Sequence, residues 1–172
     1  RIIPDRGSWI EIMFGTNDVM WCFMDQRRRR RKFFATTLLR ALGYGADEEI
    51  LKLFYDFKTL ETGRKWTEKD LHLLVMKADL VDTESKDAVI ARRYDPCTPA
   101  LMEQIAAAGV GRVEVVDVSA DNGTLIKTLR EDAKIGIHNE EDALKDIYKR
   151  MRPGDPPTVI NAKQMIHKLF FE

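Results

Sequence analysis

A proline- and glycine-rich segment near the C-terminus is the feature that most constrains the fold. Residues 152–157 read Arg-Pro-Gly-Asp-Pro-Pro. Proline lacks an amide donor and clashes with the preceding helical turn, so no helix continues through this segment. An amphipathic stretch precedes it from about Glu140 to Met151, and another follows from Ala162 to Phe171. The sequence therefore predicts two helices joined by a rigid turn.

The N-terminal part has two different periodicities. Residues 9–14 are β-prone, residues 15–18 supply a turn and residues 19–24 are apolar again, which predicts a hairpin. From Ala35 onward the apolar residues have helical spacing, until Gly43 and Gly45 end the run. Asp47 is a candidate cap for a second helix. The apolar stripe expected on that helix comprises Ile50, Leu51, Leu53, Phe54 and Phe57.

The pattern changes between about residues 58 and 127. A short helix capped by Thr67 is expected to run through Leu71, Leu74 and Val75. A strand at 88–91, a helix opened by Thr98-Pro99 and a strand at 113–118 follow, before an exit turn at 121–123.

These patterns predict an α+β fold, in which an N-terminal β-hairpin with several helices carries a small inserted α/β unit. The main domain is then discontinuous, formed by residues 1–57 and 128–172, and residues 58–127 form the inserted subdomain. A chain of 172 residues is long enough for one such domain with its insertion. Because it begins with Arg1 and not Met, we interpret it as a piece of a longer protein.

The charge balance excludes one simple way of binding nucleic acid. The 28 Lys and Arg residues equal the 28 Asp and Glu residues, so overall basicity cannot drive binding. The charge is uneven, however, because residues 27–32 are five arginines and a lysine. No apolar run is long enough to cross a membrane or act as a signal peptide, so we expect a cytoplasmic protein without membrane contact.

Residues that carry catalysis or bind metals are scattered. Cys22 and Cys97 lie far apart and outside any CxxC pair, so neither a disulfide framework nor a zinc knuckle is expected. His72, His138 and His167 have no partner at metal-ligand spacing. We therefore expect no catalytic residue, no metal site and no cofactor in this segment.

Trp9 and the arginine block suggest a different chemistry. Aromatic faces stack on unpaired bases at roughly 1–3 kcal/mol per base, and arginines neutralise phosphates, so this pairing suits single-stranded nucleic acid. The alternative is structural: Trp9 covers one face of the hairpin, and the arginines form a solvated edge that discourages strand pairing. Composition leaves both interpretations open.

Three ordered segments together resemble one known family. They are residues 1–9 (RIIPDRGSW), residues 29–32 with 35–42, and residues 148–157, which end in RPGDPP. They resemble the second lobe of the β subunit of bacterial DNA-directed RNA polymerase, and residues 58–127 resemble the lineage-variable insertion of that lobe. Phe34 stands where the family usually has a proline, and Thr37 replaces an aliphatic residue.

The resemblance implies a DNA-gripping lobe that serves DNA-templated transcription and is non-catalytic by itself. It implies contact with the non-template strand and with downstream DNA. Trp9 is implied to stack on a non-template base near the transcription start, and Arg30 and Arg152 to approach the same strand. Arg29 and Arg31 are implied to add phosphate contacts. Arg6, beside Trp9, completes the expected DNA-binding set.

The implied partners are promoter and downstream DNA, the rest of the β subunit, the β′ and α subunits and a sigma factor. The parent enzyme of the resemblance is a nucleotidyltransferase whose magnesium is held by the β′ subunit. Two alternatives stay open. In one, the insertion docks a transcription regulator and DNA contact is incidental. In the other, the chain is a stand-alone nucleic-acid enzyme, which requires a cluster of carboxylates or histidines that we do not find in the sequence.

Overall fold

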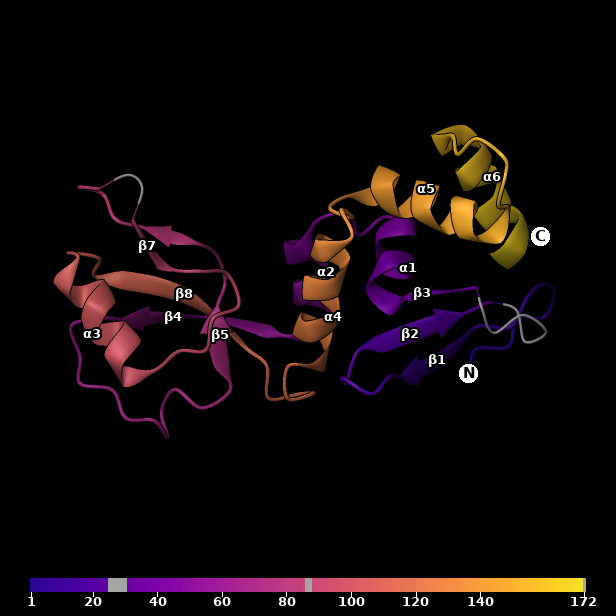
Figure 1. Ribbon diagram of the computed structural model, residues 1–172. Helices are drawn as coiled ribbons and strands as arrows, with labels where there is room; N and C mark the ends of the chain where they lie inside the picture. The colour runs from indigo at the N-terminus through magenta and orange to yellow at the C-terminus, as the bar shows by residue number, and fades with distance from the viewer. Residues whose placement is uncertain (25–30, 86–87, 172) are drawn as a thin grey trace. The chain divides into compact units, whose positions relative to one another are not determined.

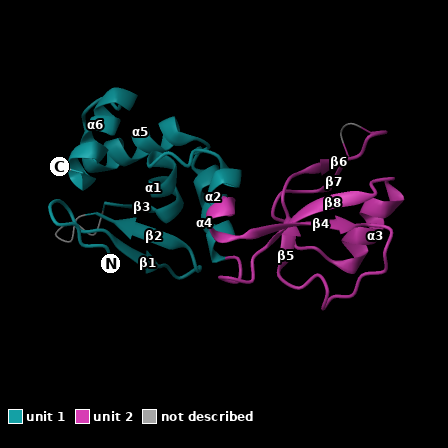
Figure 2. Ribbon diagram, turned by 180° about the vertical axis from the view of Figure 1, so that it is seen from behind, with its two compact units in different colours: residues 1–50, 124–172 teal, residues 51–123 magenta. Residues whose placement is uncertain are grey.

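The computed structural model describes residues 1–24, 31–85 and 88–171, and the chain forms two compact units (Figures 1 and 2). Unit 1 comprises residues 1–50 and 124–172, and unit 2 comprises residues 51–123. Short antiparallel sheets and helices build the chain, so the predicted α+β class is confirmed. The chain passes between the units after Ile50 and after Gly123, whereas the sequence patterns set these boundaries after Phe57 and Lys127.

A three-stranded antiparallel sheet forms the N-terminal part of unit 1. Strands β1 (Glu11–Phe14) and β2 (Met20–Phe23) form the predicted hairpin, with Ile12 opposite Cys22. A further strand, β3 (Lys32–Phe34), was not predicted and pairs with β2, which gives the order β1-β2-β3. The buried residues Cys22 and Phe33 pair across β2 and β3 and join the core.

The helices of unit 1 pack on this sheet and on one another (Figure 1). Helix α1 (Ala35–Ala41), helix α5 (Glu140–Met151), helix α6 (Val159–Phe170) and the break at 152–157 confirm the predictions. Asn139 and Thr158 cap α5 and α6, because each side chain accepts a hydrogen bond from the amide three residues later. Helix α4 (Thr124–Lys134) was not predicted. Helix α2 (Asp47–Phe54) is shorter than expected, and Phe57 lies in a strand.

Unit 2 has its own sheet and core. Strands β4 (Asp56–Glu61), β8 (Arg112–Asp117) and β5 (Leu74–Met76) pair in the order β4-β8-β5, all antiparallel. Strands β6 (Leu80–Val81) and β7 (Val89–Ala91) form a second, two-stranded sheet. Helix α3 (Pro99–Ala107) is capped by Thr98 as predicted, and it buries Met102 and Ile105 in the same core as Val113 and Val115. The predicted strand, helix and strand are confirmed.

The predicted short helix after Thr67 is wrong. The local signal is real, because the Thr67 hydroxyl donates to Asp70 at 2.7 Å and accepts from the Asp70 amide at 3.3 Å. The turn ends at Leu73, whose φ of +58° is incompatible with a continuing right-handed helix. Leu74 and Val75 instead belong to β5, where pairing with β8 buries them. Sheet pairing therefore overrides the local helix signal.

A buried polar network ties α1 to α4 in unit 1. Arg40 and Asp132 are 1% and 0% exposed, and the Asp132 carboxylate accepts hydrogen bonds from Thr36, from Thr37 at 2.6 Å and from Arg40 Nε at 3.4 Å. Arg40 also forms an ion pair with Asp47 and donates to two backbone carbonyls. Burial raises the pKa of Asp132, while its hydrogen-bond donors act in the opposite direction. The departure from the family pattern at Thr37 therefore provides a donor to a buried carboxylate.

Candidate nucleic-acid interface

Gly7 fixes the N-terminal segment against α6. Its φ is +111°, a backbone conformation that glycine adopts without the cost of a Cβ atom. A Cβ atom at this position would lie 2.3 Å from the carbonyl oxygen of Leu169. Two backbone hydrogen bonds of 2.7 and 3.0 Å also join Ile2 to Ile10. The segment that carries Trp9 is thus held at the C-terminal end of α6.

The Trp9 indole is solvent-accessible and lies beside a cation. Its exposed fraction is 39%. The guanidinium carbon of Arg1 lies 5.6 Å from the ring centroid, and the same guanidinium forms an ion pair with Glu11 at 2.9 Å. Arg6 is exposed on the same segment. Trp9 and Arg6 are therefore accessible, as their predicted DNA contacts require.

Only the end of the arginine block can be described. The predicted contact residues Arg29 and Arg30 lie outside the described residues. Arg31 donates from Nη1 to the carbonyl oxygen of Met151 at 2.8 Å, and Arg150 donates from Nη1 to the carbonyl oxygen of Lys32 at 3.2 Å. These two bonds join the start of β3 to the C-terminal end of α5. The phosphate contact of Arg31 stays a prediction.

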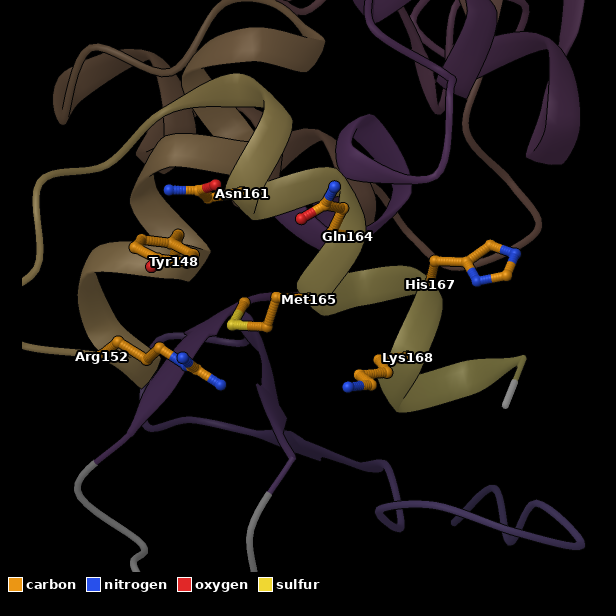
Figure 3. A pocket seen from close by; sticks show the side chains of 7 residues that line it. All are labelled: Tyr148, Arg152, Asn161, Gln164, Met165, His167 and Lys168. Atoms are coloured by element: carbon orange, nitrogen blue, oxygen red, sulfur yellow. The ribbon is translucent and has the colours of Figure 1, made fainter.

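Arg152 lies directly after α5 and lines a pocket between α5 and α6 (Figure 3). The volume of this pocket is about 510 Å³. In Figure 3 the side chains of Arg152 and Lys168 extend toward each other on either side of Met165, whereas His167 extends away. No aspartate or glutamate lines the pocket among the described residues, and the lining consists of Tyr148, Arg152, Asn161, Gln164, Met165, His167 and Lys168.

The sequence analysis did not identify Lys168 as a candidate site residue, although the composition of α6 indicates a cationic helix. The helix contains Lys163, His167 and Lys168 but no acidic residue. Lys163 is neutralised by Glu140, with 3.0 Å between Nζ and Oε1. Neither Arg152 nor Lys168 forms an ion pair with another residue in the described part of the chain. Two cations therefore remain available in one pocket.

Both cysteines are buried, and the described ranges contain no candidate metal cluster. Burial raises the pKa of Cys22 to about 12 and that of Cys97 to about 11, because an ionised thiol would lose its hydration. We therefore expect both thiols to be protonated at neutral pH. Within residues 1–24, 31–85 and 88–171, no group of three or more His, Cys, Asp or Glu side chains could hold a metal ion. No helix in these ranges is long and apolar enough to span a membrane.

Comparison with known proteins decides the family. The β subunit of DNA-directed RNA polymerase from Methylacidiphilum infernorum is 42% identical over 183 residues, which include 100% of this chain and 14% of that relative. The β subunits from Chlamydia pneumoniae and Protochlamydia amoebophila are 37% and 38% identical, again over 100% of this chain and 13% of each relative. The chain belongs to the bacterial RNA polymerase β-subunit family. The resemblance inferred from the sequence is thereby confirmed.

No family model matches the chain. The β-subunit segment described here spans 13–14% of the length of these relatives. Its similarity to them extends through unit 2, since 100% of the chain is matched. Unit 2 is therefore part of the homologous region and not an addition foreign to these relatives.

Proposed function

We propose that this segment is the DNA-gripping second lobe of a bacterial RNA polymerase β subunit, which serves transcription without catalysing a reaction itself. Its ligand is the non-template DNA strand, together with downstream DNA. Its assembly partners are the rest of the β subunit, the β′ and α subunits and a sigma factor. Magnesium belongs to another subunit in this proposal.

The convergence of three distant sequence segments carries the proposal. Gly7 holds the N-terminal segment at the end of α6, and Arg31 binds the end of α5. Arg152 follows directly after α5. Helices α5 and α6 pack on each other, and their C-terminal ends thus anchor Trp9, Arg31 and Arg152. A chain that used these segments only as turns and solvated edges would not need to gather them there.

The chemistry of these residues fits a single DNA strand. A half-exposed indole can stack on an unpaired base, whatever its sequence. The guanidinium groups of Arg6 and Arg152 add positive charge that can neutralise phosphates. Because stacking tolerates every base and phosphate contacts carry no sequence information, we expect weak sequence discrimination by this segment alone.

The test is a titration of fluorescein-labelled single-stranded DNA with the purified 172-residue chain, followed by anisotropy at increasing salt. Replacing Trp9 by Leu removes the aromatic face but keeps an apolar side chain. If stacking is worth roughly 1–3 kcal/mol, affinity falls about 5- to 150-fold. Replacing Arg152 by Ala should lower the slope of log K against log salt by about 0.7, the value for one phosphate on a single strand.

Trp66 of unit 2 is the matched control for Trp9. It also lies under an arginine, because the guanidinium carbon of Arg64 is 4.7 Å from its ring centroid. Trp66→Leu should leave DNA affinity unchanged. Equal effects of the two tryptophan substitutions, or binding that does not respond to salt, would contradict the proposal. Salt-independent binding would instead favour an apolar docking surface.

A further inference from the structure

We infer that Arg152 and Lys168 together form a site for one backbone phosphate of a single DNA strand, in the pocket between α5 and α6. This inference rests on the proposed function and adds a residue to it. Lys168 belongs to none of the three segments that resemble the polymerase lobe. It reaches the site from a different helix than the one that precedes Arg152.

The first argument is the charge inside the pocket. Arg152 and Lys168 extend toward each other across Met165 (Figure 3). Like charges repel, and no acidic residue among the described lining residues compensates them. An anion between the two cations removes this repulsion and accepts hydrogen bonds from both. The site therefore favours a negatively charged ligand over a neutral one.

The second argument is the size and lining of the pocket. Its volume of about 510 Å³ lies within the range of about 300–1,000 Å³ in which proteins bind small ligands, so one nucleotide has room. Met165 offers an apolar surface next to the cations. Asn161 and Gln164 provide amide donors and acceptors that can contact a sugar or a base edge. A bare inorganic anion would leave this apolar and amide lining unused.

The third argument is position. Leu169, whose carbonyl oxygen contacts the N-terminal segment at Gly7, directly follows Lys168. Arg152 directly follows Met151, whose carbonyl oxygen accepts from Arg31. The pocket is therefore built from the same helix ends that hold the Trp9 segment and the basic block. A strand that stacks on Trp9 would reach the pocket with a neighbouring part of its backbone.

The test compares Lys168→Gln with Lys163→Gln in the anisotropy titration of the full chain. Both lysines lie on α6, but the charge of Lys163 is already paired with Glu140. Loss of one exposed charge contact should weaken DNA binding roughly two- to fivefold for Lys168→Gln and lower the salt slope by up to about 0.7. Lys163→Gln should leave both quantities unchanged. Equal thermal unfolding of the two variants excludes a folding defect.

Oligonucleotides with one methylphosphonate linkage identify the phosphate. This uncharged linkage is moved along the strand one position at a time. At one position it should lower the affinity of the unsubstituted protein but cause no further loss of affinity in Lys168→Gln. If Lys168→Gln behaves like Lys163→Gln, the inference is wrong. If a deoxynucleoside monophosphate binds the unsubstituted protein but not Lys168→Gln, and does not displace the strand, the pocket belongs to a free nucleotide, and the inference is also wrong.

The two proposals fail in different ways. If Trp9→Leu and Arg152→Ala weaken DNA binding but Lys168→Gln does not, only the phosphate site is refuted. If the unsubstituted chain does not bind single-stranded DNA in a salt-dependent way, the proposed function fails for this chain and the phosphate site fails with it.

Discussion

Removal of the Asp132 carboxylate should destabilise unit 1 strongly. In Asp132→Ala, the hydroxyls of Thr36 and Thr37 lose their acceptor, and Arg40 loses one of its two carboxylate partners. Breaking a buried ion pair by removing one partner costs about 3–5 kcal/mol, because an uncompensated charge stays buried. The remaining pair between Arg40 and Asp47 limits the loss, so we expect the lower end of this range.

The thermal consequence follows from the size of unit 1. For a domain of up to about 100 residues, each kcal/mol shifts the melting temperature by roughly 4–8 °C, so a loss of about 3 kcal/mol lowers it by roughly 12 °C or more. Urea unfolding followed by labelling of Cys22 isolates this effect, since Cys22 lies in the core of unit 1. Glu131→Ala is the matched control on the same helix, because Glu131 forms an ion pair with the exposed Lys134. Its expected cost is below about 1 kcal/mol.

Equal stability losses in Asp132→Ala and Glu131→Ala would refute this reasoning. Such a result would mean that the Asp132 carboxylate adds nothing beyond a surface ion pair. An intermediate loss of stability is expected for Asp132→Asn. The amide keeps one oxygen acceptor, but its NH₂ group replaces the other oxygen and points a donor at the donors of the network.

Three further outcomes are expected. Gly7→Ala should lower both DNA affinity and the melting temperature, since its Cβ atom would lie 2.3 Å from the Leu169 carbonyl oxygen, and an unchanged variant would contradict the packing. The pKa of Asp117 is lowered from 3.8 to about 2, chiefly by a hydrogen bond from Lys58. The ionised Asp117 therefore stabilises the folded state above pH 3.8, and this contribution is lost as the pH falls toward 2. Urea titrations over this pH range should show a weaker pH dependence for Asp117→Asn. Cys22 and Cys97 should resist alkylation in the native chain and react after denaturation, and rapid native labelling of either would disprove its burial.

Local patterns predicted those elements whose signals are local. The hairpin of β1 and β2 and the helices α5 and α6 were recognisable from alternation, helical spacing and the proline break. Helix α4 was missed although it has the same kind of signal, because Leu125, Ile126 and Leu129 are buried at helical spacing. Strand β3 lacks such a signal: its three residues follow the basic block, and only the pairing with β2 makes them a strand.

The same distinction between local and tertiary signals applies to the candidate site. Trp9 and Arg152 were proposed as site residues because they belong to short contiguous segments that resemble the polymerase lobe, and their DNA contacts stay predictions. The opposition of Arg152 and Lys168 depends on how α6 packs on α5 after the proline break, which spacing does not determine. The contact of Gly7 with Leu169 joins opposite ends of the sequence for the same reason. The network of Asp132 also depends on tertiary packing, although Thr37 marked one of its positions as unusual.

Zero net charge is compatible with the proposed DNA binding, because this chain separates its charges locally. Salt screens interactions between exposed charges over about 10 Å at 0.1 M, so distant carboxylates do not weaken a cationic pocket. The number of neutralised phosphates, not the net charge, determines the salt dependence of binding. Helix α6 contains no acidic residue, and the side chains that extend into its pocket from α6 and from the end of α5 are anchored on packed helices. In the proposed complex, binding would order the exposed side chains of Arg152 and Lys168 but not the packed helices that carry them.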